Sequence, residues 1–248
     1  IPNTGSCTEL SSRVTSLSKT RFLEALTHQR TGRLMEALSV YQDLLKGAPD
    51  HLDVLNNMGA CLTNLGRVEE AVDVLSRAIE LSPDDADLLN NMGNALQRAD
   101  RIEEAIIRFK VAVQNSPGNA VIRLNLAKAF LRQGEYAAGV EQLERARLLE
   151  PESAAIIFTD VMALPVIYDS EEQLDAARAR FSEKLSTLED GTWTLTDPPS
   201  EVGMSNFYLP YQGQNDRELQ ERLAKAYLKA CPLLEFMAPH CHDTSRRR

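Results

Sequence analysis

Four prolines stand 34 residues apart in this chain, and this interval constrains the fold more than any other feature. They are Pro49, Pro83, Pro117 and Pro151. Because proline cannot continue a helix, the equal spacing predicts structural units of equal length that each end at the same point. A unit of this length accommodates two short helices and a turn, so we expect the chain to be all-α.

Other residue types keep the same period. A turn-forming residue recurs at Gly32, Gly66, Asp100 and Gly134, and a large apolar residue at Tyr41, Leu75, Phe109 and Leu143. Small residues recur in both halves of each unit, at Ala25, Gly59, Gly93 and Ala127 and again at Ala37, Ala71, Ala105 and Gly139. Since residues without a large side chain let two backbones approach closely, the pattern predicts tightly packed helix pairs.

This order of residues resembles the tetratricopeptide repeat, a 34-residue unit of two helices. The units are 18–51, 52–85, 86–119 and 120–153, after an N-terminal extension of residues 1–17. The resemblance implies a right-handed superhelix, an α-solenoid, whose concave groove is lined by the first helix of each unit and binds extended peptides or partner helices. The first unit departs from the pattern at Arg21, Glu24 and His28, as expected of an end repeat that faces solvent.

The letters NNMG occur twice, in VLNNMGACL and LLNNMGNAL, at the 34-residue interval. The second asparagine of each copy stands at position six of its repeat, which faces the groove in this family. An amide offers both donors and an acceptor, so it can bind a peptide backbone. We therefore predict a groove site made of Asn56, Asn57, Asn90, Asn91, Asn94, Asn125 and Lys128. The alternative, that these amides only satisfy helix–helix hydrogen bonds, stays open at this point.

The period is lost from Ala154 onward, and residues 154–248 are expected to form extra helices and a loop. The expected elements are a helix over 154–164, a helix with a capping box of Ser170 and Gln173, a polar loop over 189–203, and a helix that starts near Asn215 or Asp216 and stops at Pro232. The aromatic residues Phe207, Tyr208 and Tyr211 are predicted to dock this region onto the last repeats.

Three later segments carry a second resemblance. LPVIYDSEEQLDAARARF, FYLPYQGQNDRELQERLAKAY and CPLLEFMAPHC are similar to the linking region of bacterial SPINDLY-type, O-GlcNAc transferase-like proteins. The asparagine row is also similar to the ladder by which that family holds acceptor proteins. The resemblance implies a link to a C-terminal glycosyltransferase domain that uses a nucleotide sugar and is missing from this chain. The alternatives are a freestanding adaptor and a scaffold that self-assembles through its solenoid ends.

The chain itself is not expected to catalyse a reaction or to bind a cofactor, because it contains no phosphate-binding glycine loop and no nucleophile motif. Its net charge of −9 argues against nucleic-acid binding. The only concentration of possible metal ligands, His240 to Asp243, is too close-set for a structural site, so no metal is expected. Without a signal peptide or a long apolar run, and with four scattered cysteines, the sequence predicts a cytoplasmic protein.

Overall fold

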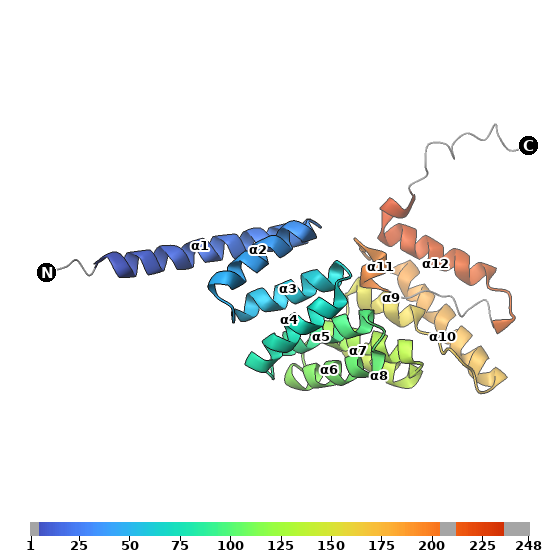
Figure 1. The fold of residues 1–248 in the computed structure, drawn as a ribbon. Coiled ribbons are helices and arrows are strands. Elements are labelled where there is room, and N and C mark those ends of the chain that lie inside the picture. The colour runs from blue at the N-terminus through green and yellow to red at the C-terminus, as the bar shows by residue number, and fades with distance from the viewer. Residues whose placement is uncertain (1–4, 204–211, 236–248) are drawn as a thin grey trace, which may run out of the picture. The chain divides into compact units, whose positions relative to one another are not determined.

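The computed structural model describes residues 5–203 and 212–235, with side chains from Ser18 onward, and these residues form helices joined by turns and loops. They fall into two compact units that divide after Asn125, inside helix α7 (Ala120–Gln133). Unit 1 contains three helix pairs (Figure 1): α1 (Gly5–Arg30) with α2 (Leu34–Gly47), α3 (Leu52–Asn64) with α4 (Val68–Leu81), and α5 (Ala86–Arg98) with α6 (Ile102–Asn115). The expected all-α fold of tandem helix pairs is confirmed.

Each pair turns at a residue with a positive φ angle, and this residue is Gly32, Gly66 or Asp100 in unit 1. The N–H after it donates to a carbonyl five residues earlier, from Arg67 to Leu62 at 3.0 Å in the second pair. This is the six-to-one bond of a Schellman motif, which satisfies a carbonyl that the helix end leaves unpaired. Glycine favours the turn because the left-handed region is strained for most L residues.

The helices of a pair approach each other at the predicted small residues. A Cβ atom on Gly59 would lie 2.5 Å from Cγ of Leu75, and one on Gly93 would lie 2.5 Å from Cε1 of Phe109. Leu75 and Phe109 are fully buried, so the large residue of the second helix fills the space that glycine leaves on the first. Between pairs, Leu89, Ala112 and Ile122 form a further buried cluster. Among the first helices of unit 1, α1 is a neighbour of α3, and α3 is a neighbour of α5.

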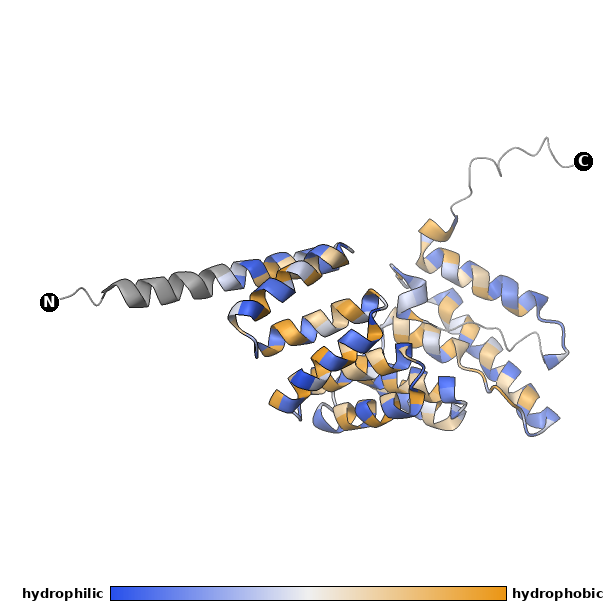
Figure 2. Ribbon diagram, in the orientation of Figure 1, coloured by the Kyte–Doolittle hydropathy of each residue, from blue (hydrophilic) through white to orange (hydrophobic). Residues whose placement is uncertain are grey.

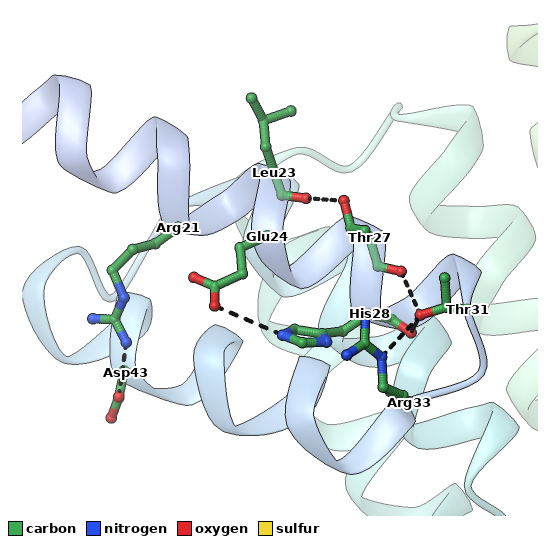
Figure 3. Close-up of polar contacts among 8 residues, drawn as sticks. All are labelled: Arg21, Leu23, Glu24, Thr27, His28, Thr31, Arg33 and Asp43. Atoms are coloured by element: carbon green, nitrogen blue, oxygen red, sulfur yellow. Dashed lines mark hydrogen bonds and ion pairs between the residues drawn. The ribbon is translucent and has the colours of Figure 1, made fainter.

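The first pair carries polar contacts where the other pairs are apolar (Figure 3). The guanidinium of Arg21 donates to Asp43 at 3.0 Å, and Nε2 of His28 lies 3.7 Å from Glu24. Leu23, at position six of this repeat, projects away from these residues with 54% of its surface exposed. Of the three departures from the repeat pattern, Arg21 and Glu24 are solvated, with 39% and 56% of their side chains exposed, whereas only 18% of the His28 side chain is exposed.

Unit 2 packs the remaining helices around a core of its own. After α7 come α8 (Tyr136–Leu149), α9 (Ala154–Met162), α10 (Glu171–Asp190), α11 (Pro198–Glu201), α12 (Arg217–Ala230) and the 3₁₀ helix η2 (Pro232–Glu235). Apolar residues of α9, α10 and α12 fill the core, and the connecting segment adds Leu195 and Val202. The backbone N–H of Leu195 also donates to the carbonyl of Ala230 at 2.9 Å. Residues 154–203 and 212–235 thus form a packed helical region.

The expected start of α10 is confirmed, whereas the expected loop over 189–203 needs correction. Oγ of Ser170 accepts from the N–H of Gln173 at 3.2 Å, while Oε1 of Gln173 accepts from the N–H of Asp169 at 2.6 Å. Within the loop the structure has the short helix α11, because two prolines at its first positions are pre-set for a helical turn. The predictions for Phe207, Tyr208, Tyr211 and His240 to Asp243 lie outside the described residues.

A buried carboxylate joins three helices of unit 2. Asp160 of α9 has 2% of its surface exposed. Its Oδ1 accepts from Nη2 of Arg180 at 2.5 Å, and its Oδ2 accepts from Lys184, both on α10. Nη1 of Arg147, on α8, lies 3.7 Å from Oδ2. Since an unpaired charge in a protein interior is very unfavourable, these cations are what allows an aspartate here.

The described helices mix hydrophilic and hydrophobic residues along their length (Figure 2). Amphipathic helices of this kind bury one face against a neighbour and leave the other in water. None of the helices in residues 5–203 and 212–235 combines the length and the apolar content that a bilayer span requires.

Replacing Gly66 by alanine should lower the free energy of unfolding by about 1–2 kcal/mol, because the turn requires a left-handed backbone. Gly47 provides the matched control: it ends α2, its φ is not positive, and a methyl group added to it would have no atom within 4 Å. Gly47→Ala should be neutral or stabilising. Urea unfolding followed by circular dichroism measures both, and equal effects would contradict the assignment of the turn.

Replacing Asp160 by asparagine should destabilise the protein by about 3–5 kcal/mol, because it leaves the partly buried Arg180 and Lys184 without their counter-charge. Asp43→Asn serves as the comparison, since Asp43 also meets two cations, Arg21 and Lys46, but its side chain is 41% exposed. Water screens the charges around Asp43, so Asp43→Asn should lower the free energy of unfolding much less than Asp160→Asn does. Thermal unfolding of the two variants distinguishes these outcomes, and a mild effect at Asp160 would refute the proposed role.

Candidate functional site

The predicted asparagines form two amide–amide hydrogen bonds between neighbouring repeats. Nδ2 of Asn91 on α5 donates to Oδ1 of Asn56 on α3 at 2.7 Å. Nδ2 of Asn125 on α7 donates to Oδ1 of Asn90 on α5 at 2.9 Å. All four side chains are half-buried. Each bond joins position five of one repeat to position six of the next, so the amides cross-link the first helices of consecutive pairs within unit 1.

This arrangement accounts for the paired asparagines of NNMG. The first asparagine serves as the acceptor for the following repeat, and the second donates to the preceding one. The row of inter-repeat bonds stops where the neighbouring repeat has no asparagine at the matching position. Asn57 meets no amide from the first repeat, where position five is Phe22, and its Nδ2 donates instead to the carbonyl of Asp53 at 2.8 Å. At the other end of the row, position five of the fourth repeat is the buried Leu124. This repeat therefore offers no amide acceptor to a following one.

The amides retain hydrogen-bonding capacity beyond these bonds. An asparagine side chain has two N–H donors and an oxygen with two lone pairs, and each of the bonds above engages one N–H or one lone pair. Asn94, one turn further along α5, is half-buried and has no hydrogen bond among the described residues. A row of such groups can pair with both the N–H and the C=O of another backbone.

Lys128, one turn beyond Asn125 on α7, has a partner that the sequence did not indicate. Its Nζ donates to the carbonyl of Glu201, the last residue of α11, at 2.5 Å. Burial lowers the pKa of Lys128 to about 8, although the Glu201 carboxylate opposes this shift. A cation at this point complements the negative end of the short helix. The predicted groove cation is therefore bound to the protein's own segment within unit 2.

Glu201 holds that segment in shape. Its Oε1 accepts from the N–H groups of Thr196 and Asp197, both at 2.7 Å, and from Oγ1 of Thr196 at 2.9 Å. These bonds to the start of α11 outweigh the effect of burial, so the pKa of Glu201 lies below its usual value, although burial alone would raise it. Val202 and Leu195 anchor the two ends in the core of unit 2. The segment is thus an ordered turn pinned against α7.

The sequence left helix–helix hydrogen bonds of the amides open as an alternative without indicating their partners, and it did not indicate the Lys128–Glu201 contact. The first left a signal, since two adjacent asparagines repeated at 34 residues place a donor and an acceptor in every repeat. The second left none, because 73 residues separate Lys128 from Glu201. No group of three or more histidine, cysteine or acidic side chains within the described ranges is arranged to hold a metal.

Comparison with known proteins agrees with this architecture. A family model described as "TPR repeat" matches residues 61–100, and one described as "Tetratricopeptide repeat" matches residues 96–157. Residues 61–157 therefore match tetratricopeptide repeats. The match covers the second, third and fourth repeats in part or whole, including Asn90, Asn91 and Asn125. No curated protein matches the chain.

Solved tetratricopeptide structures share the fold. TTC0263 of Thermus thermophilus, described as a thermophilic TPR protein, is 19% identical, with a TM-score of 0.58 over 85% of this chain and 99% of that one. MamA 41-end from Desulfovibrio magneticus RS-1 is 20% identical, with a TM-score of 0.58 over 70% of this chain and 97% of that one. At these identities the likeness establishes the fold alone.

The buried state of Lys128 predicts a pH-dependent contribution to stability. Its folded pKa of about 8 lies below the ordinary value of 10.5. Between these values the unfolded chain holds a proton that the folded chain has released, so stability should rise with pH there. The unfolding free energy of the wild type minus that of Lys128→Met should therefore increase from about pH 8 towards about pH 10.5.

Denaturant unfolding across this pH range measures the difference between the two proteins. Lys225→Met is the control, because Lys225 is exposed on α12 and should show no such trend relative to the wild type. A flat difference profile for Lys128→Met would mean that the ammonium is not desolvated by α11.

Proposed function

We propose that the protein is an interaction scaffold whose repeats bind an extended segment of a partner protein through the amide row of α3, α5 and α7. The observation that carries this proposal is the alignment of Asn57, Asn91 and Asn125 at one position of three consecutive first helices, two of them fixed by bonds to the preceding repeat. Groups held in place before binding lose little conformational entropy when a ligand arrives.

The spacing of the row suits a peptide backbone. Packed helices lie about 8–10 Å apart, and an extended chain rises about 3.3 Å per residue. One asparagine would therefore meet roughly every third residue of the ligand. Because an amide reads the backbone rather than the side chains, the row favours an extended conformation over a particular sequence.

The inter-repeat bonds are compatible with this role. Asn91 and Asn125 each use one N–H for the neighbouring repeat, which leaves the second N–H and the oxygen. Asn57 and Asn94 make no inter-repeat bond within the described part of the chain. A structural use of the amides and a binding use can therefore operate in the same row.

The resemblance of the later segments to O-GlcNAc transferase-like proteins suggests a second function, the recruitment of acceptors for glycosyl transfer. The adaptor is the better supported of the two, because the family models that match residues 61–157 describe tetratricopeptide repeats. The reading frame after Arg248 discriminates between them: a continuation into alternating strands and helices would favour the transferase. We place the scaffold in the cytoplasm, in accord with the free, buried thiols of Cys61 and Cys231.

The combined variant Asn57→Ala, Asn91→Ala and Asn125→Ala tests the groove. Peptides selected on the wild-type protein from a random displayed library supply the ligand, and fluorescence anisotropy measures their affinity. Each lost hydrogen bond should weaken binding by about 1 kcal/mol, so the triple variant should bind about 100-fold more weakly. An unchanged affinity would leave the row with a structural role alone.

Two controls separate binding from folding. Asn64→Ala alters an exposed asparagine at the end of α3, two turns beyond Asn57, and should leave the affinity unchanged. The double variant Asn57→Ala and Asn94→Ala removes no inter-repeat bond, so it should weaken peptide binding while thermal stability stays at the wild-type level. A loss of stability without a loss of affinity in this variant would count against the proposal.

A further inference from the structure

The ion cluster around Asp160 carries more positive than negative charge. Arg147, Arg180 and Lys184 meet this single carboxylate, and no other acid in the described ranges forms an ion pair with them. Glu144 and Glu150, three residues to either side of Arg147, do not pair with it. Counted over Asp160 and its three ion-pair partners alone, the cluster has two more cationic than anionic side chains, and the carboxylate of Glu144 also acts electrostatically on the neighbouring Tyr136.

The three cations are not equivalent. Arg180 is committed to the fold, because its guanidinium bonds Oδ1 of Asp160 and also donates to the carbonyls of Asp160 at 3.2 Å and Ala163 at 3.3 Å. Arg147 lies 3.7 Å from Oδ2 without a hydrogen bond, and its side chain is 40% exposed. Lys184 shares that same oxygen and uses one of its three donors there. The donors of Arg147 and two of Lys184 therefore remain for another acceptor.

Their common contact places these two cations close together. Nη1 of Arg147 and Nζ of Lys184 both lie within ion-pair distance of one oxygen, Oδ2 of Asp160. Like charges at such a separation repel, and Asp160 offsets only part of this repulsion. A second anion between them would remove the remainder, with the planar guanidinium offering a two-pronged contact.

A tyrosine adds a neutral donor to the same region. Cζ of Arg180 lies 6.0 Å from the centre of the Tyr136 ring. Burial raises the pKa of Tyr136 against the opposing effect of Arg180, and the carboxylates of Asp160 and Glu144 also raise it. The hydroxyl therefore stays protonated at neutral pH and is able to donate a hydrogen bond.

We propose that Arg147 and Lys184 form a binding site for a doubly charged phosphate group. The two unmatched charges equal those of a phosphate monoester near neutral pH, and its oxygens provide acceptors for both side chains. Arg180 and Asp160 support the site by fixing the end of α9. The site lies within unit 2 and does not depend on peptide binding by the amide row.

Calorimetric titration of the protein with inorganic phosphate tests the site. Saturable binding at one phosphate per chain is expected, and sodium chloride at the same ionic strength should not reproduce it. Arg147→Met keeps an aliphatic side chain but removes the guanidinium group. It should weaken phosphate binding by about 10-fold or more. Because Arg147 is partly exposed and makes no hydrogen bond, this variant should fold normally.

Arg145→Met is the matched control, because Arg145 lies on the same helix and pairs at 2.6 Å with the exposed Glu141. It should bind phosphate as the wild type does. O-phosphoserine as a second titrant separates the two sources of this chemistry: binding equal to that of phosphate assigns the site to a phosphorylated side chain, and binding of phosphate alone assigns it to the free ion. Equal affinities of wild type and Arg147→Met for phosphate would overturn the proposal.

Discussion

The rest of this structure depends on the close approach of two helices at a residue that has almost no side chain. In the second and third pairs this residue is a glycine, and a methyl group there would lie 2.5 Å from Leu75 or Phe109. The large residue is buried because the small one makes room for it, so the two positions act as a unit. Once each pair is closed in this way, the remaining apolar face is available for the next pair, and the repeats stack.

Stacking places the first helices side by side, and polar groups then find partners that no single repeat provides. The amide bonds Asn91–Asn56 and Asn125–Asn90 are the clearest case. Burying an amide without a partner is unfavourable, whereas a repeated pair satisfies each amide with the next one. The same row therefore stabilises the stack and presents ordered donors and acceptors to a ligand. Unit 2 uses charge in a similar way, with Asp160 joining α8, α9 and α10.

Much of the fold could be predicted because it rests on local rules repeated at a fixed interval. Prolines mark the ends of units, glycines mark turns such as that at Gly66, and small residues mark close contacts. The turn at Asp100 follows the same rule without a glycine, because Asp100 has a φ of 61° and takes the place of glycine. The recurrence of asparagine at one position of three repeats was visible in the sequence for the same reason. The hydrogen bonds of these asparagines were not, because a donor and its acceptor lie 35 residues apart.

Beyond the repeats the sequence still indicated α9, expected over 154–164, and α12, expected from Asn215 or Asp216 to Pro232. The helix after Ser170 was predictable from its cap, but α11 and its contact with Lys128 were not, since neither follows a period. The sequence by itself determined the repeat length, the helix pairs, the turns and the row of asparagines, because each depends on residues near one another in the chain. Only the tertiary structure decided which amide bonds which, that Lys128 holds Glu201, and that three cations share Asp160. Those contacts join residues from separate helices, and packing alone brings them together.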